Sequence, residues 1–222
     1  MRPSLYRPPR NWSARLREYD LVGGLRAVFL ENELLRVGFL ADRGTDLIEF
    51  LYKPRDLDFA WLSAGGIREA AAPGVCDPLG SFLDTYPGGW QEVLPNGGAP
   101  SSHAGATYGQ HGEISLVPWD YELLEDGEDA VGVRFTVTGR KAPFRLTKEV
   151  RLRAGEPSFS VNEVLCNESD VRVHVMWGHH ITFGPPFLQP GCRVERLQHL
   201  AAGRDGHAVA DSGWCGVINC SV

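Results

Sequence analysis

The sequence lacks the features that would place the protein in a membrane or in a disulfide-stapled class. No stretch reaches the roughly 18 apolar residues of a transmembrane helix, and no apolar segment of signal-peptide length follows the N-terminal arginines. The five cysteines are odd in number and widely spaced, without a Cys-x-x-Cys pair, which argues against a disulfide framework and a zinc ribbon. We therefore expect a soluble, cytoplasmic protein with free thiols.

Long runs of like charge are also absent, although the net charge is -6. This distribution favours neither a nucleic acid nor a membrane as partner and is compatible with a small neutral ligand. The chain has no Gly-x-Ser-x-Gly motif and no phosphate-binding loop, so hydrolase and nucleotide-binding functions are poorly supported.

Glycine and proline are abundant, with 26 and 15 residues spread through the 222. Together with a hydrophobic content of 43%, this pattern is typical of many strands joined by tight turns around one sizeable core. We predict an all-β fold with few short helices and a single domain over residues 1–222. Residues 1–20, rich in proline and arginine, are expected to form an arm over the surface.

Alternating apolar residues predict the strands. A hairpin is expected from residues 27–31 and 34–40, with Leu35, Val37 and Phe39 on one face. Further strands are expected at 47–52, 113–117 and 119–124, then around residues 131–137, 144–152 and 159–167. A weak helical patch covers 196–202.

Residues 63–110 contain four glycine-rich turns and little periodicity, apart from a short helix expected at 67–72 and a strand at 90–94. Long irregular segments inside a compact domain tend to be functional when they are ordered. We interpret this segment as the wall of a site.

Residues 171–177 alternate as a half-buried strand, and Gly178 interrupts the pattern before His179 and His180. Neighbouring residues in extended backbone point to opposite faces. One histidine can therefore face a cavity while the other lies among packed side chains.

Several motifs occur together: GGWQEVLPN at 88–96, QHGE at 110–113, Pro-Trp at 118–119, Asn-Glu-Ser at 167–169, and WGHH at 177–180 followed by Phe183. In these motifs the chain resembles the galactose mutarotase (aldose 1-epimerase) family, more closely its divergent bacterial members that carry His-Gly-Glu and Trp-Gly-His-His. The resemblance covers about residues 27–188.

The resemblance implies a large antiparallel β-sandwich, a galactose mutarotase-like supersandwich, with a sugar-binding cleft. It also implies interconversion of the α and β anomers of an aldose by acid/base ring opening, with no metal and no cofactor. Histidine suits the acid role because its pKa lies near neutrality. On this basis His180 is the expected acid, and His111 is a second hydrogen-bonding group at the ring oxygen.

The remaining expected site residues would bind the sugar, with Trp90 or Trp177 as stacking surface. This set comprises Trp90, Gln91, Glu92, Asn96, Glu113, Trp177 and His179. Glu113 could also orient the His111 imidazole or form a structural salt bridge. His103, His174, His199 and His207 are interpreted as structural or surface residues.

The sequence departs from the family pattern at the general base, which in the family is a glutamate near the C-terminal end of a longer chain. No glutamate follows Glu195 here. Either the chain is cut short and catalytically defective, or Glu113 or Glu92 has taken the role. A sandwich without its last strands would leave an open sheet edge, which pairing into a homodimer could cover.

Two other functions stay open. One is a carbohydrate-binding protein of the same fold that binds without turnover. The other is a cupin-like metal-dependent enzyme with His111, Glu113 and His179 or His180 as ligands. A His-x-His followed by a spaced glutamate is expected in a cupin, and the sequence does not contain it.

Overall fold

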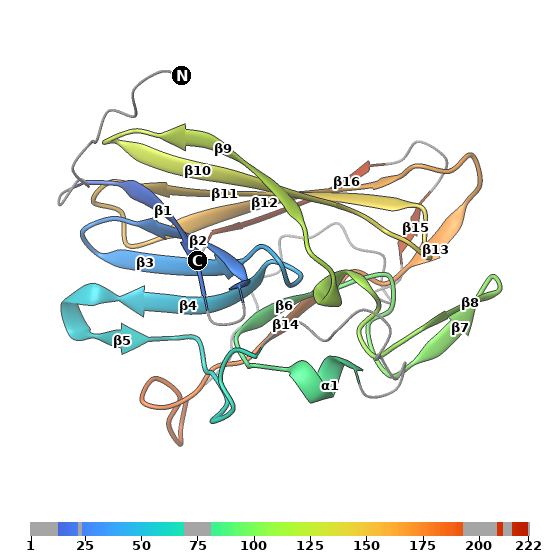
Figure 1. The fold of residues 1–222 in the computed structure, drawn as a ribbon, viewed down its shortest axis with the longest axis horizontal. Coiled ribbons are helices and arrows are strands. Elements are labelled where there is room, and N and C mark those ends of the chain that lie inside the picture. Colours follow the sequence, from blue (N-terminus) through green and yellow to red (C-terminus); the bar gives the residue numbers. More distant parts are fainter. Residues whose placement is uncertain (1–12, 22–23, 69–80, 193–207, 211–214, 222) are drawn as a thin grey trace.

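The protein consists mainly of two antiparallel sheets packed against each other (Figure 1). The computed structural model describes residues 13–21, 24–68, 81–192, 208–210 and 215–221. The first sheet has the order β1-β2-β3-β4-β6-β14, with β5 beside β4, and the second has the order β16-β12-β11-β10-β9. The predicted antiparallel β-sandwich is therefore confirmed, while a single domain over residues 1–222 stays a prediction.

The strands of the first sheet are β1 (Arg15–Asp20), β2 (Arg26–Glu31), β3 (Leu35–Leu40), β4 (Asp46–Tyr52), β5 (Leu57–Asp58), β6 (Trp90–Val93) and β14 (Gly178–Ile181). Those of the second are β9 (Asp120–Asp126), β10 (Ala130–Thr138), β11 (Phe144–Arg153), β12 (Phe159–Asn167) and β16 (Cys215–Ser221). Two small sheets pair β7 (Ser101–His103) with β8 (Ala106–Tyr108) and β13 (Val173–Val175) with β15 (Ala208–Ala210). The helices are α1 (Ser81–Thr85) and the 3-10 turns Lys53–Arg55 and Ile114–Leu116.

Alternation in the sequence places the core between the two sheets. Val131, Val133 and Phe135 of β10 are fully buried, and Val37 and Phe39 of β3 belong to the same buried cluster. Burial of these apolar side chains is the main favourable contribution to folding. The predicted hairpin of β2 and β3 and the predicted faces of its residues are confirmed.

Two local predictions were wrong. Residues 15–20 form the edge strand β1, paired with β2, rather than a surface arm. Residues 114–116 form a 3-10 turn instead of a strand. The remainder of the predicted arm, most of the helix expected at 67–72 and the helix expected at 196–202 lie outside the described residues.

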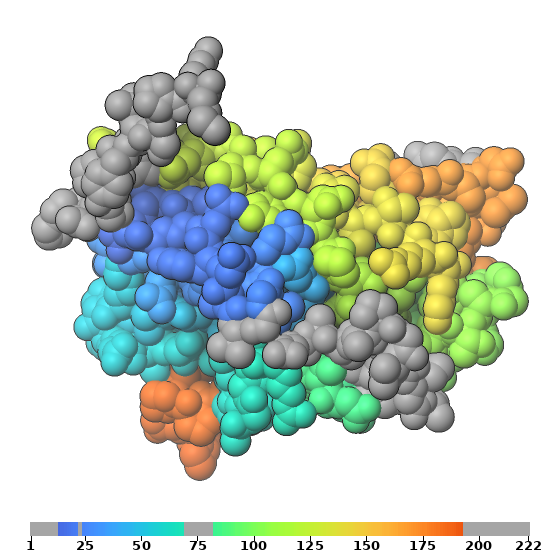
Figure 2. All heavy atoms as spheres, in the orientation of Figure 1, coloured from blue at the N-terminus to red at the C-terminus, as the bar shows by residue number. Residues whose placement is uncertain are grey.

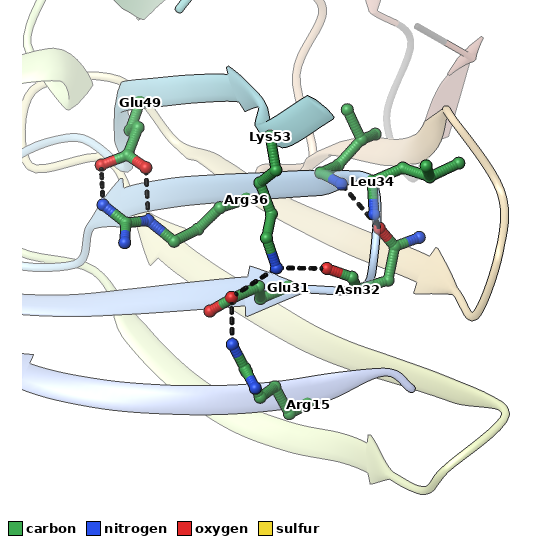
Figure 3. A network of polar contacts seen from close by, with 8 residues as sticks. Arg15, Glu31, Asn32, Leu34, Arg36, Glu49 and Lys53 are labelled. Atoms are coloured by element: carbon green, nitrogen blue, oxygen red, sulfur yellow. Dashed lines mark hydrogen bonds and ion pairs between the residues drawn. The ribbon is translucent and has the colours of Figure 1, made fainter. Parts of the chain in front are cut away.

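The β2–β3 hairpin is held by polar contacts on the first sheet (Figure 3). Arg15 and Lys53 both pair with the carboxylate of Glu31, which is 9% exposed. The Asn32 side-chain oxygen accepts hydrogen bonds from the backbone N–H groups of residues 34 and 35 at 2.8 and 2.7 Å. These contacts fix the hairpin because the Asn32 side chain accepts hydrogen bonds from backbone N–H groups that the turn would otherwise leave without partners.

The segment after β14 protrudes beside the segment after β5, orange beside cyan in Figure 2. The rings of Phe59 and Phe187 join the two segments at a centroid distance of 4.8 Å.

Cys166 on β12 is disulfide-bonded, so the expectation of a free thiol is wrong there, whereas Cys192 is free. Within the described ranges, no helix has the length and apolarity to cross a membrane.

Candidate active site

Strands β6 and β14 lie side by side and divide the two histidines between opposite faces of the first sheet. His180 lies opposite Gln91 and His179 lies opposite Glu92 in the antiparallel register. The histidines lie within a strand of their own, because Gly178 begins β14 instead of ending the strand that contains Val175. Their alternation therefore sends His180 to the outer face and His179 to the sandwich interior.

The His180 pocket lies on the outer face and has a volume of about 220 Å³. The imidazole rings of His180 and His111 meet there with centroids 5.1 Å apart. The pocket is lined by Val93, Gly97, His111, Met176, Trp177, Gly178, His179 and His180. Two titratable rings in van der Waals reach of each other inside a concave pocket are a candidate catalytic arrangement.

A strained turn brings His111 to this pocket. The backbone of His111 is left-handed, with φ of 62°, which a non-glycine residue adopts at an energetic cost. Gly112 follows with φ of 86° and runs so close to β6 that a Cβ atom would lie 1.9 Å from the carbonyl oxygen of Leu94. The backbone N–H of Glu113 donates to that same carbonyl at 3.0 Å. Glycine is thus required after the histidine, which accounts for the His-Gly motif.

Helix α1 and the residue that follows it supply two aromatic rings beside the histidines that sequence reasoning missed. Phe82 is 2% exposed, and its ring contacts His111 edge-on with a centroid distance of 4.6 Å. The ring of Tyr86 lies 5.3 Å from His180, and its hydroxyl hydrogen-bonds to Thr182. The spacing of these two aromatic residues, one helical turn apart, was the available signal.

Burial, and then the charge of the neighbouring His180, lower the pKa of His111. Two nearby imidazoles disfavour a second positive charge because like charges repel in a site of reduced dielectric. The charge of His180 thus adds to burial in favouring the neutral form of the His111 imidazole.

A second group of titratable side chains, which we call the interior cluster, joins the two sheets beneath the pocket. It consists of Glu92 on β6, His179 on β14, Lys148 on β11 and Glu163 on β12. The His179 ring nitrogens lie 3.2 Å from a Glu92 oxygen (Nδ1) and 3.0 Å from a Glu163 oxygen (Nε2). The Lys148 ammonium lies 2.6 Å from Glu92 and 3.5 Å from Glu163.

Opposite charges in the interior cluster set its protonation. Burial disfavours the charged form of His179, but the charge of Glu92 and hydrogen bonds to both carboxylates raise its pKa to about 10. Burial likewise opposes ionisation of Glu92, yet His179 and Lys148 hold its pKa well below the ordinary value. Burial and the nearby Glu92 charge raise the pKa of Glu163 to about 7. The two carboxylates therefore favour the protonated form of His179, with one carboxylate oxygen within 3.2 Å of each ring nitrogen.

Glu92, Glu163 and His179 have the donor types of a metal site, with ligand atoms within 4.8 Å of one another. The Lys148 ammonium already supplies a positive charge between the two carboxylates. The cupin-like ligand set does not converge either, because His111 faces the pocket while Glu113 is bonded elsewhere and His179 faces the interior.

His180, His111, Trp177 and His179 line the His180 pocket, although the His179 ring is directed to the interior cluster, and Gln91 contacts His180 from within the sheet. Four other expected site residues do not line it. Trp90 and Glu92 alternate onto the interior face, where the Trp90 ring lies 5.2 Å from that of His179. Of the two tryptophans expected to stack on the sugar, Trp177 lines the pocket and Trp90 does not.

Asn96 and Glu113 support loops. The buried Asn96 amide donates to the carbonyls of Ala99 and Gly109 at 2.8 and 3.2 Å. The Glu113 carboxylate accepts hydrogen bonds from the backbone N–H groups of residues 140–142 at 3.0 to 3.2 Å. Neither Glu113 nor Glu92 thus reaches the position of a base in the pocket.

Residues 23–215 match a protein family described as "Domain of unknown function (DUF4432)". The chain belongs to this family. No curated protein sequence matches the DUF4432 chain.

Solved structures share the fold of this DUF4432 domain. A candidate aldose 1-epimerase from Klebsiella pneumoniae subsp. pneumoniae is 21% identical with a TM-score of 0.65, over 78% of this chain and 48% of that one. A galactose mutarotase-like protein from Clostridium acetobutylicum is 13% identical with a TM-score of 0.55, over 80% and 56%. A candidate mutarotase from Salmonella typhimurium is 14% identical with a TM-score of 0.52, over 73% and 50%.

At these identities the likeness establishes the fold, which is the galactose mutarotase-like sandwich that the sequence motifs implied. The DUF4432 chain spans about half the length of these structures.

Proposed function

We propose that this protein interconverts the α and β anomers of a neutral aldose by acid/base ring opening in the His180 pocket. The observation that carries the proposal is the pair of imidazoles from His111 and His180, 5.1 Å apart in one pocket. The sandwich fold shared with candidate aldose 1-epimerases and mutarotases supports the same reaction class.

The reaction needs two proton transfers, and one protonated and one neutral imidazole can perform both. His180 donates its proton to the ring oxygen while the C1–O5 bond breaks and the aldehyde forms at C1. The anomeric hydroxyl gives up its proton to the neutral imidazole of His111, whose lowered pKa favours that form. Rotation about C1–C2 and the reverse transfers close the ring as the other anomer, so that protons balance over the cycle.

Among the described residues, no carboxylate that could act as a base lines this pocket. Glu113 and Glu92 are engaged elsewhere, at the turn of residues 140–142 and in the interior cluster. His111 is therefore the acceptor of the anomeric hydroxyl proton in the proposed reaction.

The lining also favours an uncharged sugar. It combines the indole of Trp177, the thioether of Met176 and the imidazoles, and its described residues include no lysine or arginine. Apolar faces with a few polar groups suit the alternating CH and OH surfaces of an aldose.

A cytoplasmic location and pairing with a second copy of the chain stay predictions. Light scattering at micromolar concentration tests the pairing.

Polarimetry of freshly dissolved α-D-glucose and α-D-galactose tests the proposal. The wild type should accelerate the approach to anomeric equilibrium, and His180→Asn should lower the catalysed rate about 10²-fold or more. His174→Asn is the matched control, since His174 is exposed and lies outside the His180 pocket. A folded wild type that binds these sugars without acceleration would instead indicate a carbohydrate-binding protein.

A further inference from the structure

Gln91 lies beside His180 within the sheet, as its direct partner in the register of β6 and β14. The Gln91 side chain is fully buried, so it cannot reach a ligand in the way that the sequence suggested. Its Oε1 atom lies 3.4 Å from Nδ1 of His180. Hydrogen bonds of catalytic groups are commonly long in unliganded sites and shorten when a ligand binds.

The orientation of the Gln91 amide follows from its other partners. Its Nε2 group donates to the carbonyl oxygen of Gly88 at 2.5 Å. The buried Asp46 carboxylate lies nearby: burial raises its pKa to about 7, and Arg43 and Gln91 oppose that rise. An amide oxygen cannot donate to the Gly88 carbonyl, so the NH₂ end of Gln91 faces Gly88 and the oxygen faces His180.

The surroundings of Gln91 hold this orientation. Asp46 is fully buried, and its Oδ2 atom lies 3.4 Å from Nε of Arg43, which is 3% exposed. Arg43 in turn donates to the backbone carbonyl of Thr85 in α1. A flipped Gln91 amide would place its oxygen against the Gly88 carbonyl oxygen, which repels it.

We propose that Gln91 is a positioning residue that holds neutral His180 as the Nδ1–H tautomer and leaves Nε2 as the nitrogen that exchanges protons with the ligand. An amide oxygen can only accept a hydrogen bond, so Nδ1 carries the hydrogen. The catalytic consequence rests on the proposed function. In the protonated ring Nε2–H donates to the sugar ring oxygen, and the same atom takes the proton back when the ring closes.

Nitrogen-15 NMR of protein labelled at histidine tests the tautomer directly. The His180 signals are identified by their loss in His180→Ala and followed into the alkaline range, where the ring is neutral. We expect the Nδ1–H pattern in the wild type and its loss in Gln91→Met, which keeps the approximate volume without an oxygen. Unchanged His174 signals in Gln91→Met report an intact fold.

Kinetics then separate this inference from the proposed function. Gln91→Met should lower kcat for anomer interconversion about tenfold or more with little change in KM, because a wrong tautomer disables a histidine without removing it. An Nε2–H tautomer in the wild type, or an Nδ1–H tautomer that persists in Gln91→Met, would overturn the inference. The expected tautomers without any catalysis would instead refute the proposed function and leave the role of Gln91 standing.

Discussion

At the scale of single residues, the site depends on which face of the sheet each side chain occupies. The motifs singled out His111 and His180, and the structure places both rings in one pocket. Sequence reasoning did not separate Glu92 from Gln91, because alternation assigns faces only when the register is known. Phe82 and Tyr86 were missed because helix α1, which contains Phe82 and ends just before Tyr86, lies in a segment without periodicity.

Removal of Lys148 should lower the stability of the protein strongly. Lys148 lies 5% exposed between the carboxylates of Glu92 and Glu163, so Lys148→Met leaves buried negative charge without its cation. We predict a loss of about 3–5 kcal/mol in the free energy of unfolding, measured by urea denaturation. The control Arg145→Met breaks an exposed ion pair with Glu168 and should cost less than about 1 kcal/mol. Equal effects of the two substitutions would show that the interior cluster is not electrostatically coupled.

At the scale of elements, the His-Gly-Glu segment connects the pocket to the second sheet. His111 faces the pocket, and two residues later Glu113 receives three backbone N–H groups from the turn between β10 and β11. The sequence predicted a strand here because residues 113–117 include three apolar side chains. The glycine turn and the close approach to Leu94 instead impose a 3-10 turn, which no periodicity indicates.

Replacement of Glu113 tests this role. Glu113→Ala removes the acceptor of several backbone donors, and we predict a loss of about 1.5–3 kcal/mol in unfolding free energy. Glu122→Ala, which removes an exposed partner of Arg134, is the matched control with a predicted cost below about 1 kcal/mol. Thermal melts of both variants measure the difference. A Glu113→Ala variant of wild-type stability that no longer binds sugar would restore the sequence-based assignment of Glu113 to the ligand.

At the scale of the whole molecule, alternation was strong enough to predict the sandwich, since both faces of β10 to β12 follow a period of two. The edge strand β1 was missed because most of its residues are polar, and it is half-buried over its first three residues and exposed over its last three. The interior cluster could not be predicted, because its four members come from four strands in two sheets.

The interior cluster makes stability depend on pH. The pKa of His179 is about 10 in the folded protein and 6.5 in the unfolded chain, so the folded state holds the proton more tightly. The stabilisation that protonated His179 adds to the unfolding free energy is complete below pH 6.5 and is lost as the pH rises toward 10. Urea denaturation across this range should show falling unfolding free energy in the wild type and a flatter dependence in His179→Gln. The same slope in both proteins would assign the dependence to other groups.

The central claim, that His111 and His180 act together on a sugar, is tested most directly by NMR magnetisation exchange between the anomers of D-glucose and D-galactose. The wild type, His111→Asn, His180→Asn and the double variant are compared at equal concentration. We predict accelerated exchange in the wild type, a loss of about 10²-fold or more in each single variant, and no further loss in the double variant, since the two rings act in one cycle of proton transfers. Exchange at the spontaneous rate with the wild type, or full acceleration in either single variant, would contradict the claim.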